Sequence, residues 1–249
     1  MAPLVSSIGC RLTSVGVDKV LSMSVSAKLW VVIPAYNEGE VIARVVSGAR
    51  ASYEHVVVVD DCSNDGTSAA ALAAGAIVLR HAINLGAGAA TQTGMRYALD
   101  RGAEYIVALD ADGQHQFEDI AVLLDRQRET AADVVIGSRS LGKVEGMPPM
   151  RRLVMRLAVI FTLITSGVRV SDPHNGFRLL TRRAAELIRI RQNRYAFCSE
   201  ILDCARDLGL KITEAPVTVL YTEYSLRKGQ RLTNAVQIIW DLFLARLNK

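Results

Sequence analysis

The sequence contains little cysteine and no long apolar run, and these absences exclude several classes of protein. The four cysteines are Cys10, Cys62, Cys198 and Cys204. They show no C-x-x-C spacing, so neither a zinc site nor a disulfide framework is indicated, and we expect free thiols in a reducing cytosol. No uninterrupted apolar stretch reaches the roughly 20 residues that a membrane-spanning helix needs. At most, we expect peripheral attachment to a membrane.

A secretory leader and a nucleic-acid-binding face are also missing. A signal peptide needs an apolar run of roughly 7–15 residues behind basic residues, and residues 1–28 are Ser-rich without one. We interpret 1–28 as a poorly ordered extension, with Met23 as an alternative start, or as a short amphipathic helix. The net charge of +4 favours an anionic ligand or a membrane surface. No basic run is interleaved with aromatic residues, so no nucleic-acid partner is predicted.

Strand-like and helix-like segments alternate along the first half of the chain. Short apolar runs predict strands at 29–34, 55–60, 76–80, 105–109 and 133–139. Helical spacing of apolar residues predicts helices over 38–51, 67–74, the segment ending near 101, and 117–130. This alternation predicts an α/β fold with a mostly parallel sheet covered on both faces.

The stretch from Glu104 to Ile120 is the chemical centre of the sequence. A buried strand breaks at once into Asp110-Ala111-Asp112-Gly113, with Gln114 and His115 just beyond. Open α/β sheets bind ligands at the carboxyl ends of their strands. Carboxylate oxygens suit Mg²⁺ or Mn²⁺ bridging a diphosphate. An isolated D-x-D is more often a solvated turn, but here other strand ends carry polar clusters as well.

Those other clusters follow the first three strands. Tyr36, Asn37 and Glu38 could hold a base or ribose. Asp60 and Asp61 are placed to accept from base N–H groups or ribose hydroxyls. The glycines of Asn84-Leu85-Gly86-Ala87-Gly88 resemble a phosphate-binding helix start, although close packing explains them equally well.

The second half of the sequence leaves several alternatives open. The apolar stretch 153–168 is either a buried core helix or an interfacial helix with its arginines toward lipid phosphates. Residues 232–249 suit an amphipathic helix. The turn from Asp172 to Arg178 is either a ligand-site loop or a plain surface loop. Glu200 either faces a cleft or supports a helix N-terminus electrostatically. Arg227, Lys228 and Arg231 form a mobile loop that closes on phosphate, or a solvated basic face.

Six motifs in this order and spacing resemble the family 2 glycosyltransferases of the GT-A fold. They are VVIPAYNEGEVI, VVVVDDCSNDGT, NLGAGAATQTG, ALDADGQHQFEDI, IGSR and DPHNGFRLL. The likeness covers about residues 29–231 and is greatest to the polyprenyl-phosphate sugar transferases of the dolichyl-phosphate mannose synthase type. One departure is that Tyr221-Thr222-Glu223-Tyr224-Ser225 stands where mannose synthases begin a basic motif with Arg. That departure weakens the case for mannose as the transferred sugar and for GDP as the nucleotide of the donor.

The resemblance implies roles for particular residues. The metal ligands would be Asp110, Asp112 and Gln114, holding Mg²⁺ or Mn²⁺. The nucleotide-sugar donor would be bound by Pro34, Ala35, Tyr36, Glu38, Asp60, Asp61, Asp110, Ala111, Arg227 and Lys228. Catalysis would depend on Asp112, Arg139, Arg178 and Glu200, with Arg139 and Arg178 near phosphates.

The resulting hypothesis is an inverting, metal-dependent transferase that moves a sugar from a UDP- or GDP-sugar to a polyprenyl phosphate. It would act peripherally at the cytoplasmic face of the membrane, with a separate membrane partner or as a homo-oligomer. A family 2 enzyme acting on a saccharide hydroxyl is the alternative, and it would need Glu200 or Asp172 as a base. A sugar nucleotidyltransferase lacks support, because PAYNE replaces the Gly-rich loop expected after the first strand. Intact Asp110 and Asp112 argue against a non-catalytic binding module.

Overall fold

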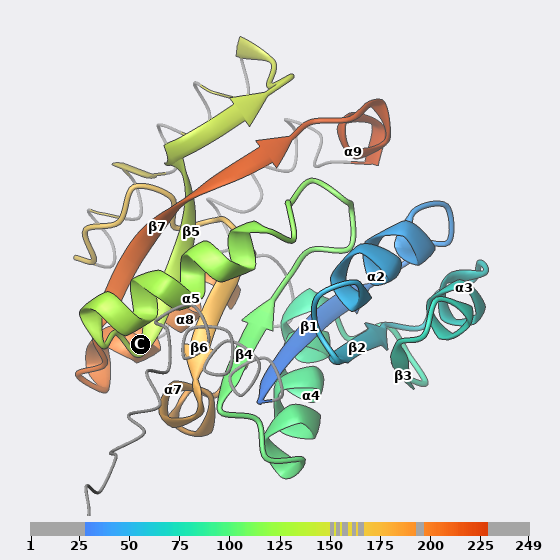
Figure 1. Ribbon diagram of the computed structural model, residues 1–249, viewed down its shortest axis with the longest axis horizontal. Coiled ribbons are helices and arrows are strands. Elements are labelled where there is room, and N and C mark those ends of the chain that lie inside the picture. Colours follow the sequence, from blue (N-terminus) through green and yellow to red (C-terminus); the bar gives the residue numbers. More distant parts are fainter. Residues whose placement is uncertain are drawn as a thin grey trace, which may run out of the picture.

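A single seven-stranded sheet forms the centre of the computed structural model (Figure 1). The structure describes residues 28–149, 152, 155, 159, 160, 163, 167–192 and 197–228. The strands are β1 (Leu29–Ala35), β2 (His55–Asp60), β3 (Ile77–Arg80), β4 (Tyr105–Ala108), β5 (Val134–Glu145), β6 (Arg178–Thr181) and β7 (Ile212–Leu220). Their order across the sheet is β3-β2-β1-β4-β6-β5-β7. Only β6 runs antiparallel to its neighbours β4 and β5. The predicted α/β fold with a mostly parallel sheet is confirmed.

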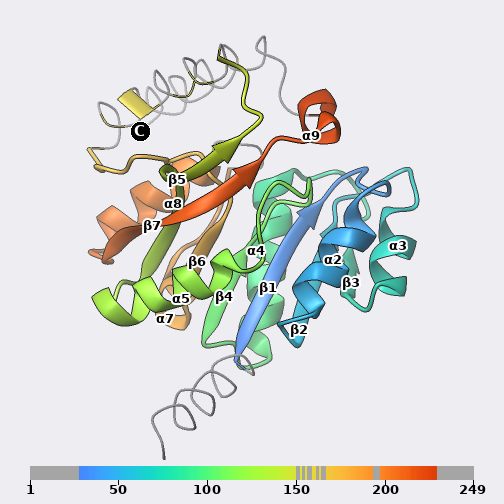
Figure 2. The same ribbon diagram turned by 45° about the horizontal axis from the view of Figure 1, so that its top comes forward.

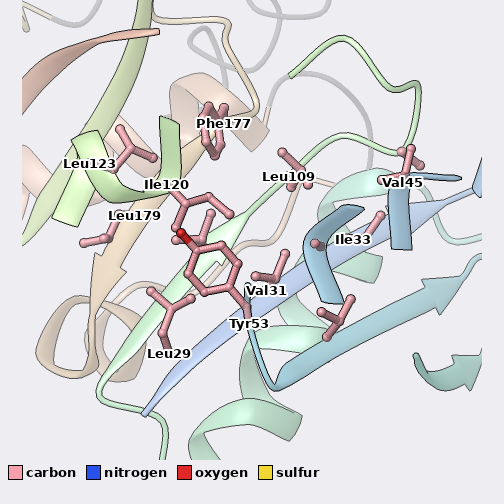
Figure 3. Packing of buried hydrophobic residues seen from close by; sticks show 14 of the residues in the cluster. Leu29, Val31, Ile33, Val45, Tyr53, Leu109, Ile120, Leu123, Phe177 and Leu179 are labelled. Carbon is pink, nitrogen blue, oxygen red and sulfur yellow. The ribbon is translucent and has the colours of Figure 1, made fainter. Parts of the chain in front are cut away.

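Helices cover both faces of the sheet, as Figure 2 shows. The helices are α2 (Ile42–Arg50), α3 (Thr67–Ala73), α4 (Ala87–Asp100), α5 (Asp119–Thr130), α7 (Arg182–Leu187), α8 (Phe197–Asp207) and α9 (Glu223–Lys228). One apolar cluster joins α2, α3 and α5 to one face of the sheet (Figure 3). A second cluster joins α4, α7 and α8 to the opposite face. Strands β1, β2 and β4 are therefore buried on both sides, which explains their continuous apolar runs.

Local sequence explains how these elements pack. In α2 the buried residues Ile42, Val45, Val46 and Ala49 recur at the spacing of one helix face. In α4 a side chain at Gly94 would place its Cβ 2.4 Å from a methyl carbon of Val32. Glycine at this position therefore lets α4 lie directly against β1.

The topology brings chemically important residues to one edge. Strands β1, β2, β3 and β4 are mutually parallel, so the loops that follow them lie at the same edge. Because β6 is antiparallel, it begins where β4 ends, and Arg178 pairs with Ala108. The predicted convergence of strand ends on one edge is confirmed, and the loop before β6 joins it.

Three features of the sheet differ from the sequence prediction. Strands β6 and β7 were not predicted, and β5 continues to Glu145 instead of ending at Arg139. These segments carry polar residues, so their local sequence does not show the apolar run expected of a strand. Each becomes a strand by pairing with neighbours that are distant in sequence. Residues 227 and 228, predicted as part of a mobile loop, lie in α9.

Several predictions fall outside the described residues. The extension 1–28, apart from residue 28, and the helix 232–249 lie there, as does Arg231. Only a few positions of 153–168 are described. Within the described part, Cys62, Cys198 and Cys204 take part in no disulfide bond. No helix among these residues combines the length and apolar character needed to cross a membrane.

Candidate active site

Hydrogen bonds join the loops after β1 and β2 into one unit. The backbone amides of Asn37 and Glu38 donate to Ser63 Oγ and Thr67 Oγ1, both at 2.8 Å. The Asn37 side chain accepts from the amide of Asn64 at 2.8 Å. Asn37 has a φ of 54°, a conformation that non-glycine residues rarely adopt and that surrounding structure must enforce. The first nucleotide-binding segment predicted from sequence is thus held in place by the second.

Asp60 and Asp61 are buried and accept hydrogen bonds from the protein itself. Asp60 accepts from the amide of Ser63, from the Ser68 hydroxyl and from Arg80. Burial raises the pKa of Asp60, but the hydrogen bonds from Ser63 and Ser68 and the charge of Arg80 outweigh it, so the pKa is lowered. The carboxylate of Asp60 therefore stabilises the turn. Its predicted contact with a nucleotide stays a prediction.

Asp61 organises the start of α4. Its carboxylate accepts from the amides of Leu85 (2.9 Å) and Gly86 (2.6 Å), and lies 2.7 Å from His81 Nδ1. His81 Nε2 in turn lies 3.0 Å from the hydroxyl of Thr93. Both carboxylate oxygens of Asp61 thus have partners in the protein itself. Nucleotide binding by Asp61 also stays a prediction.

Packing explains the glycines before α4. Gly86 has a φ of 94°, which favours glycine, and a Cβ on Gly88 would lie 2.0 Å from the carbonyl oxygen of Gln192. Close packing therefore accounts for Gly88, and backbone conformation accounts for Gly86.

Asp110 and Asp112 lie close together at the end of β4 without an ion pair to Lys or Arg in the described structure. Burial raises the pKa of Asp112 to about 6, and the charge of Asp110 adds to the effect. Burial also raises the pKa of Asp110, but the neighbouring His115, Arg139 and Arg178 outweigh it and lower that pKa. Two acids that repel each other in this way suit a shared cation.

The donor set fits a divalent ion that is completed by substrate oxygens. No group of three or more His, Cys, Asp or Glu side chains among the described residues forms a metal cage by itself. Mg²⁺ is typically held by one or two carboxylates together with substrate phosphates. Asp110 and Asp112, with Gln114 two residues further on, provide that kind of partial site. The backbone amide of Gln114 donates to Asp112 at 3.0 Å and so fixes the turn.

The first strand contributes one exposed ring to the same edge. Tyr36 is 43% exposed, so part of this residue is accessible to a ligand. Pro34 and Ala35 lie within β1, where the carbonyl of Ala35 accepts from the amide of Asp61. Ala111, between the two acids, is 5% exposed.

Arg139 is held in a fixed orientation by Asp172. The carboxylate of Asp172 accepts from the backbone amide of Arg139 and, at 2.6 Å, from both Nε and Nη2. Nη1 donates to the hydroxyl of Tyr221 at 3.2 Å. Asp172 itself is held by Glu214, which accepts from the amides of Ser171 and Asp172. A guanidinium has five N–H groups, so two have no partner among the described residues.

The structure corrects the prediction that Arg178 reaches a phosphate. Arg178 is fully buried, and its guanidinium donates to the carbonyls of Asn175, Pro173 and Cys198 at 2.6–2.9 Å. Its side chain therefore ties the loop before β6 to α8. The charge of Arg178 still acts on Asp110 at a distance.

Glu200 lies in the first turn of α8. Its carboxylate accepts from the backbone amides of Arg191 and Gln192 at 2.8–3.1 Å. The structure thus places Glu200 as an acceptor for the segment that precedes α8.

Helix α9 packs against the loop after β1. Lys228 Nζ lies 2.9 Å from Glu38 and donates to the carbonyls of Tyr36 and Asn37. The Tyr224 hydroxyl donates to the other oxygen of Glu38 at 2.6 Å. Arg227 pairs with Glu40 at 2.8 Å. The basic residues predicted to hold phosphate thus contact acids at the edge of the predicted donor site.

Two contributors were missed from the sequence: Glu214 supports Asp172, and Tyr224 donates to Glu38. His115, which the sequence analysis placed just beyond the two acids, has its Nε2 3.5 Å from Asp110. No local pattern marks Glu214 or Tyr224, because each meets a partner more than 40 residues away.

Comparisons with known proteins show the family to which the chain belongs. The family model for glycosyl transferase family 2 matches residues 30–189. A UDP-N-acetylglucosamine–dolichyl-phosphate N-acetylglucosaminyltransferase from Methanococcus voltae is 31% identical over 89% of this chain and 97% of its own length. An undecaprenyl-phosphate mannosyltransferase from Micrococcus luteus is 33% identical over 85% of this chain and 93% of its own.

A solved structure shares the fold. Glucosyl-3-phosphoglycerate synthase from Mycobacterium tuberculosis, in complex with Mn²⁺, UDP-glucose and phosphoglyceric acid, superposes with a TM-score of 0.69 at 18% identity. The match covers 91% of this chain and 82% of that one. Because the family model covers more than half of the chain and relatives above 30% identity span most of it, the chain belongs to glycosyl transferase family 2 and is a glycosyltransferase.

Proposed function

We propose that the protein transfers a sugar from a nucleotide-sugar donor to a polyprenyl phosphate. The observation that carries this proposal is that Asp172 and Glu200 already have protein hydrogen-bond donors. One of these two carboxylates would have to act as the base if the acceptor were a sugar hydroxyl. Asp172 is paired with Arg139, and Glu200 accepts from two backbone amides. A sugar hydroxyl must lose a proton during transfer, and neither carboxylate is placed free to take it.

A phosphate acceptor removes that requirement. The second pKa of a phosphate monoester is about 6, so the acceptor is largely dianionic at pH 7. One of its oxygens forms the new bond to the anomeric carbon as the bond to the nucleoside diphosphate breaks. No proton has to be removed from the acceptor. The relatives from Methanococcus voltae and Micrococcus luteus carry polyprenyl-type phosphates in their names, which supports the same acceptor class.

A divalent metal fits the acidic end of β4. Asp110, Asp112 and Gln114 would hold Mg²⁺ or Mn²⁺, which would stabilise the negative charge of the departing diphosphate. The solved neighbour was crystallised with Mn²⁺ and a UDP-sugar. Either UDP or GDP as the donor's nucleotide is compatible with the residues described.

The protein's own residues would orient the two substrates. Arg139 is preorganised by Asp172 and Tyr221, so little ordering is needed when an anionic group binds to its remaining N–H groups. Tyr36 would stack on the base. We assign Arg227 and Lys228 to the donor phosphates, which requires them to leave Glu40 and Glu38 when the donor enters.

Exposed apolar side chains are consistent with action at a membrane surface. Leu141, Ile160 and Leu163 are 55%, 54% and 42% exposed. Such side chains at a peripheral protein insert among lipid headgroups. We place the protein at the cytoplasmic face, where the nucleotide-sugar and the phosphate headgroup would meet.

The test is a radiolabel transfer assay with Mn²⁺ or Mg²⁺, with UDP- and GDP-sugars offered in turn and short-chain polyprenyl phosphate in detergent as acceptor. We expect label in the organic phase, lost with EDTA or Asp112→Ala. The variant Glu200→Gln, which keeps an acceptor oxygen for the two amides, should retain most activity. If donor is consumed only with a soluble saccharide, and Glu200→Gln or Asp172→Asn abolishes turnover, the phosphate acceptor is wrong.

A further inference from the structure

Two residues approach the carboxylate of Asp110: His115, from the same loop, and Gly176, from the loop before β6. His115 Nε2 lies 3.5 Å from Asp110 Oδ2, and the histidine side chain is only 4% exposed. From the loop before β6, Gly176 approaches so closely that a Cβ on it would lie 2.3 Å from Oδ1 and 2.5 Å from Oδ2. The side chain of Asp110 nevertheless stays 44% exposed, so part of its carboxylate remains accessible to a ligand.

The ring of His115 is itself held firmly. It packs on the ring of Phe177, with centroids 4.9 Å apart. The backbone of residues 114 and 115 pairs with the end of β7, through a bridge between His115 and Val219 and a hydrogen bond from the amide of Leu220 to the carbonyl of Gln114. The imidazole has little freedom to turn away from Asp110.

The surroundings of the second ring nitrogen indicate which nitrogen carries the proton. His115 Nδ1 is buried and has no hydrogen-bond partner among the residues that the structure describes. A neutral imidazole with its hydrogen on Nε2 leaves only a lone pair at Nδ1, whereas the other tautomer would bury an unpaired N–H and turn a lone pair toward the carboxylate. The Nε2–H tautomer therefore fits both nitrogens.

The loop that supplies Gly176 and Phe177 is equally fixed. Arg178 donates to three carbonyls, and the Asn175 side chain donates to the carbonyl of Gly137 at 2.6 Å. Three consecutive residues thus act on one carboxylate: Gly176 by contact, Phe177 through the imidazole, and Arg178 by its buried charge.

We propose that His115 and Gly176 are positioning residues that fix the Asp110 carboxylate in the orientation needed to bind the divalent metal. The inference rests on the proposed function only in taking Asp110 as a metal ligand. Partners of metal-ligating groups typically change metal affinity or activity by roughly 10–100-fold when they are removed. Because the fold already holds the carboxylate in one orientation, less conformational entropy is lost when the metal binds.

The experiment measures Mn²⁺ affinity directly, by electron paramagnetic resonance of free Mn²⁺ in the presence of UDP or GDP, without an acceptor. His115→Gln places an amide nitrogen near the position of Nε2 and should bind Mn²⁺ within about threefold of the wild type. His115→Asn places its nitrogen near Nδ1 instead, and we expect affinity to fall about tenfold or more. Gly176→Ala should fall at least as far, because its methyl group takes the space of the carboxylate.

Gly66→Ala is the matched glycine control. A Cβ there meets nothing within 4 Å, and its φ of −76° is open to alanine. It should bind Mn²⁺ like the wild type. Thermal unfolding of every variant separates lost metal affinity from lost folding.

The outcomes are distinguishable. If the wild type binds no Mn²⁺ with either nucleotide, the metal in the proposed function is wrong. If the wild type binds and folded His115→Asn binds equally well, the positioning role is wrong. Should the variants not fold, the ¹⁵N resonances of His115 in the wild type decide: the Nε2–H tautomer supports the proposal, and the Nδ1–H tautomer overturns it.

Discussion

Two acidic pairs lie at the same edge of the sheet, yet the protein treats them differently. Asp60 and Asp61 follow β2, are fully buried and accept hydrogen bonds from several protein donors. Asp110 and Asp112 follow β4, repel each other, and have no Lys or Arg ion pair in the described structure. Identical side chains can therefore stabilise a loop or await a ligand, depending on the donors that the fold supplies.

The two pairs also differ in how their ionisation affects the stability of the folded state. The donors around Asp60 lower its pKa, which means that its ionised form stabilises the folded state. Burial and Asp110 raise the pKa of Asp112 to about 6, so its ionised form destabilises the metal-free folded state. We infer that the first pair contributes to stability and that the second sacrifices some stability for ligand binding.

Replacing Asp112 should give the largest effect. We expect Asp112→Asn to reduce sugar transfer by more than roughly 100-fold, since loss of a direct ligand exceeds the usual effect of an outer partner. The same variant, without metal at pH 7, should be more stable by about 1–2 kcal/mol after allowance for solvent screening.

The sign of that stability change follows from the raised pKa. Because Asp112 binds its proton more tightly when folded, stability present near pH 4 is lost as the pH rises through about 6. Urea unfolding at pH 4 and pH 7 should show the difference between Asp112→Asn and wild type only at the higher pH. Greater stability of the wild type at pH 7 without metal would contradict the comparison.

Asp61→Ala should act mainly on folding. It leaves the amides of Leu85 and Gly86 and the ring of His81 without their acceptor. Each buried unpaired donor costs about 1–3 kcal/mol, so we expect the free energy of unfolding to fall by about 3–5 kcal/mol. Urea titration measures this. Unchanged stability together with lost nucleotide affinity would instead make Asp61 a binding residue first.

Asp60→Asn should show a smaller effect that depends on pH in the opposite sense. Because the pKa of Asp60 is lowered in the folded protein, its contribution is present above the ordinary Asp range and is lost as the pH falls below about 4. We expect the variant to be less stable by about 1–2 kcal/mol at pH 7 and nearly equal to the wild type at pH 3. A constant difference across this range would show that Asp60 acts through packing instead of charge.

Glu38 falls between the two pairs, because its partners Tyr224 and Lys228 both lie on the short helix α9. In Tyr224→Phe the carboxylate loses the phenol hydroxyl and keeps Lys228. We expect a global stability change of less than about 1 kcal/mol. Amide hydrogen exchange in 223–228 should become several-fold faster, because α9 opens more often. Unchanged exchange would mean that the Tyr224 contact contributes nothing to the docking of α9.

The sequence alone predicted the α/β class, the parallel strands of the first half and the sheet edge at which the acidic loops meet. Apolar β-branched runs and helical spacing predicted the parallel strands β1 to β4 and their helices, since both patterns are local. The acids at the strand ends predicted a ligand edge, because parallel strands end together. The family resemblance was likewise confirmed, because the family model matches residues 30–189 and relatives above 30% identity span most of the chain.

Only the tertiary structure decided which of those acids are free and which arginine is buried. The sequence shows Asp60 and Asp110 as equivalent side chains after equivalent strands, and Arg178 as a cation in a polar turn. Their roles depend on partners from elsewhere in the chain: Arg80 for Asp60, Gly176 for Asp110, and the carbonyl of Cys198 for Arg178. Hydrogen bonding and burial are properties of the packed neighbourhood, and no local pattern encodes them.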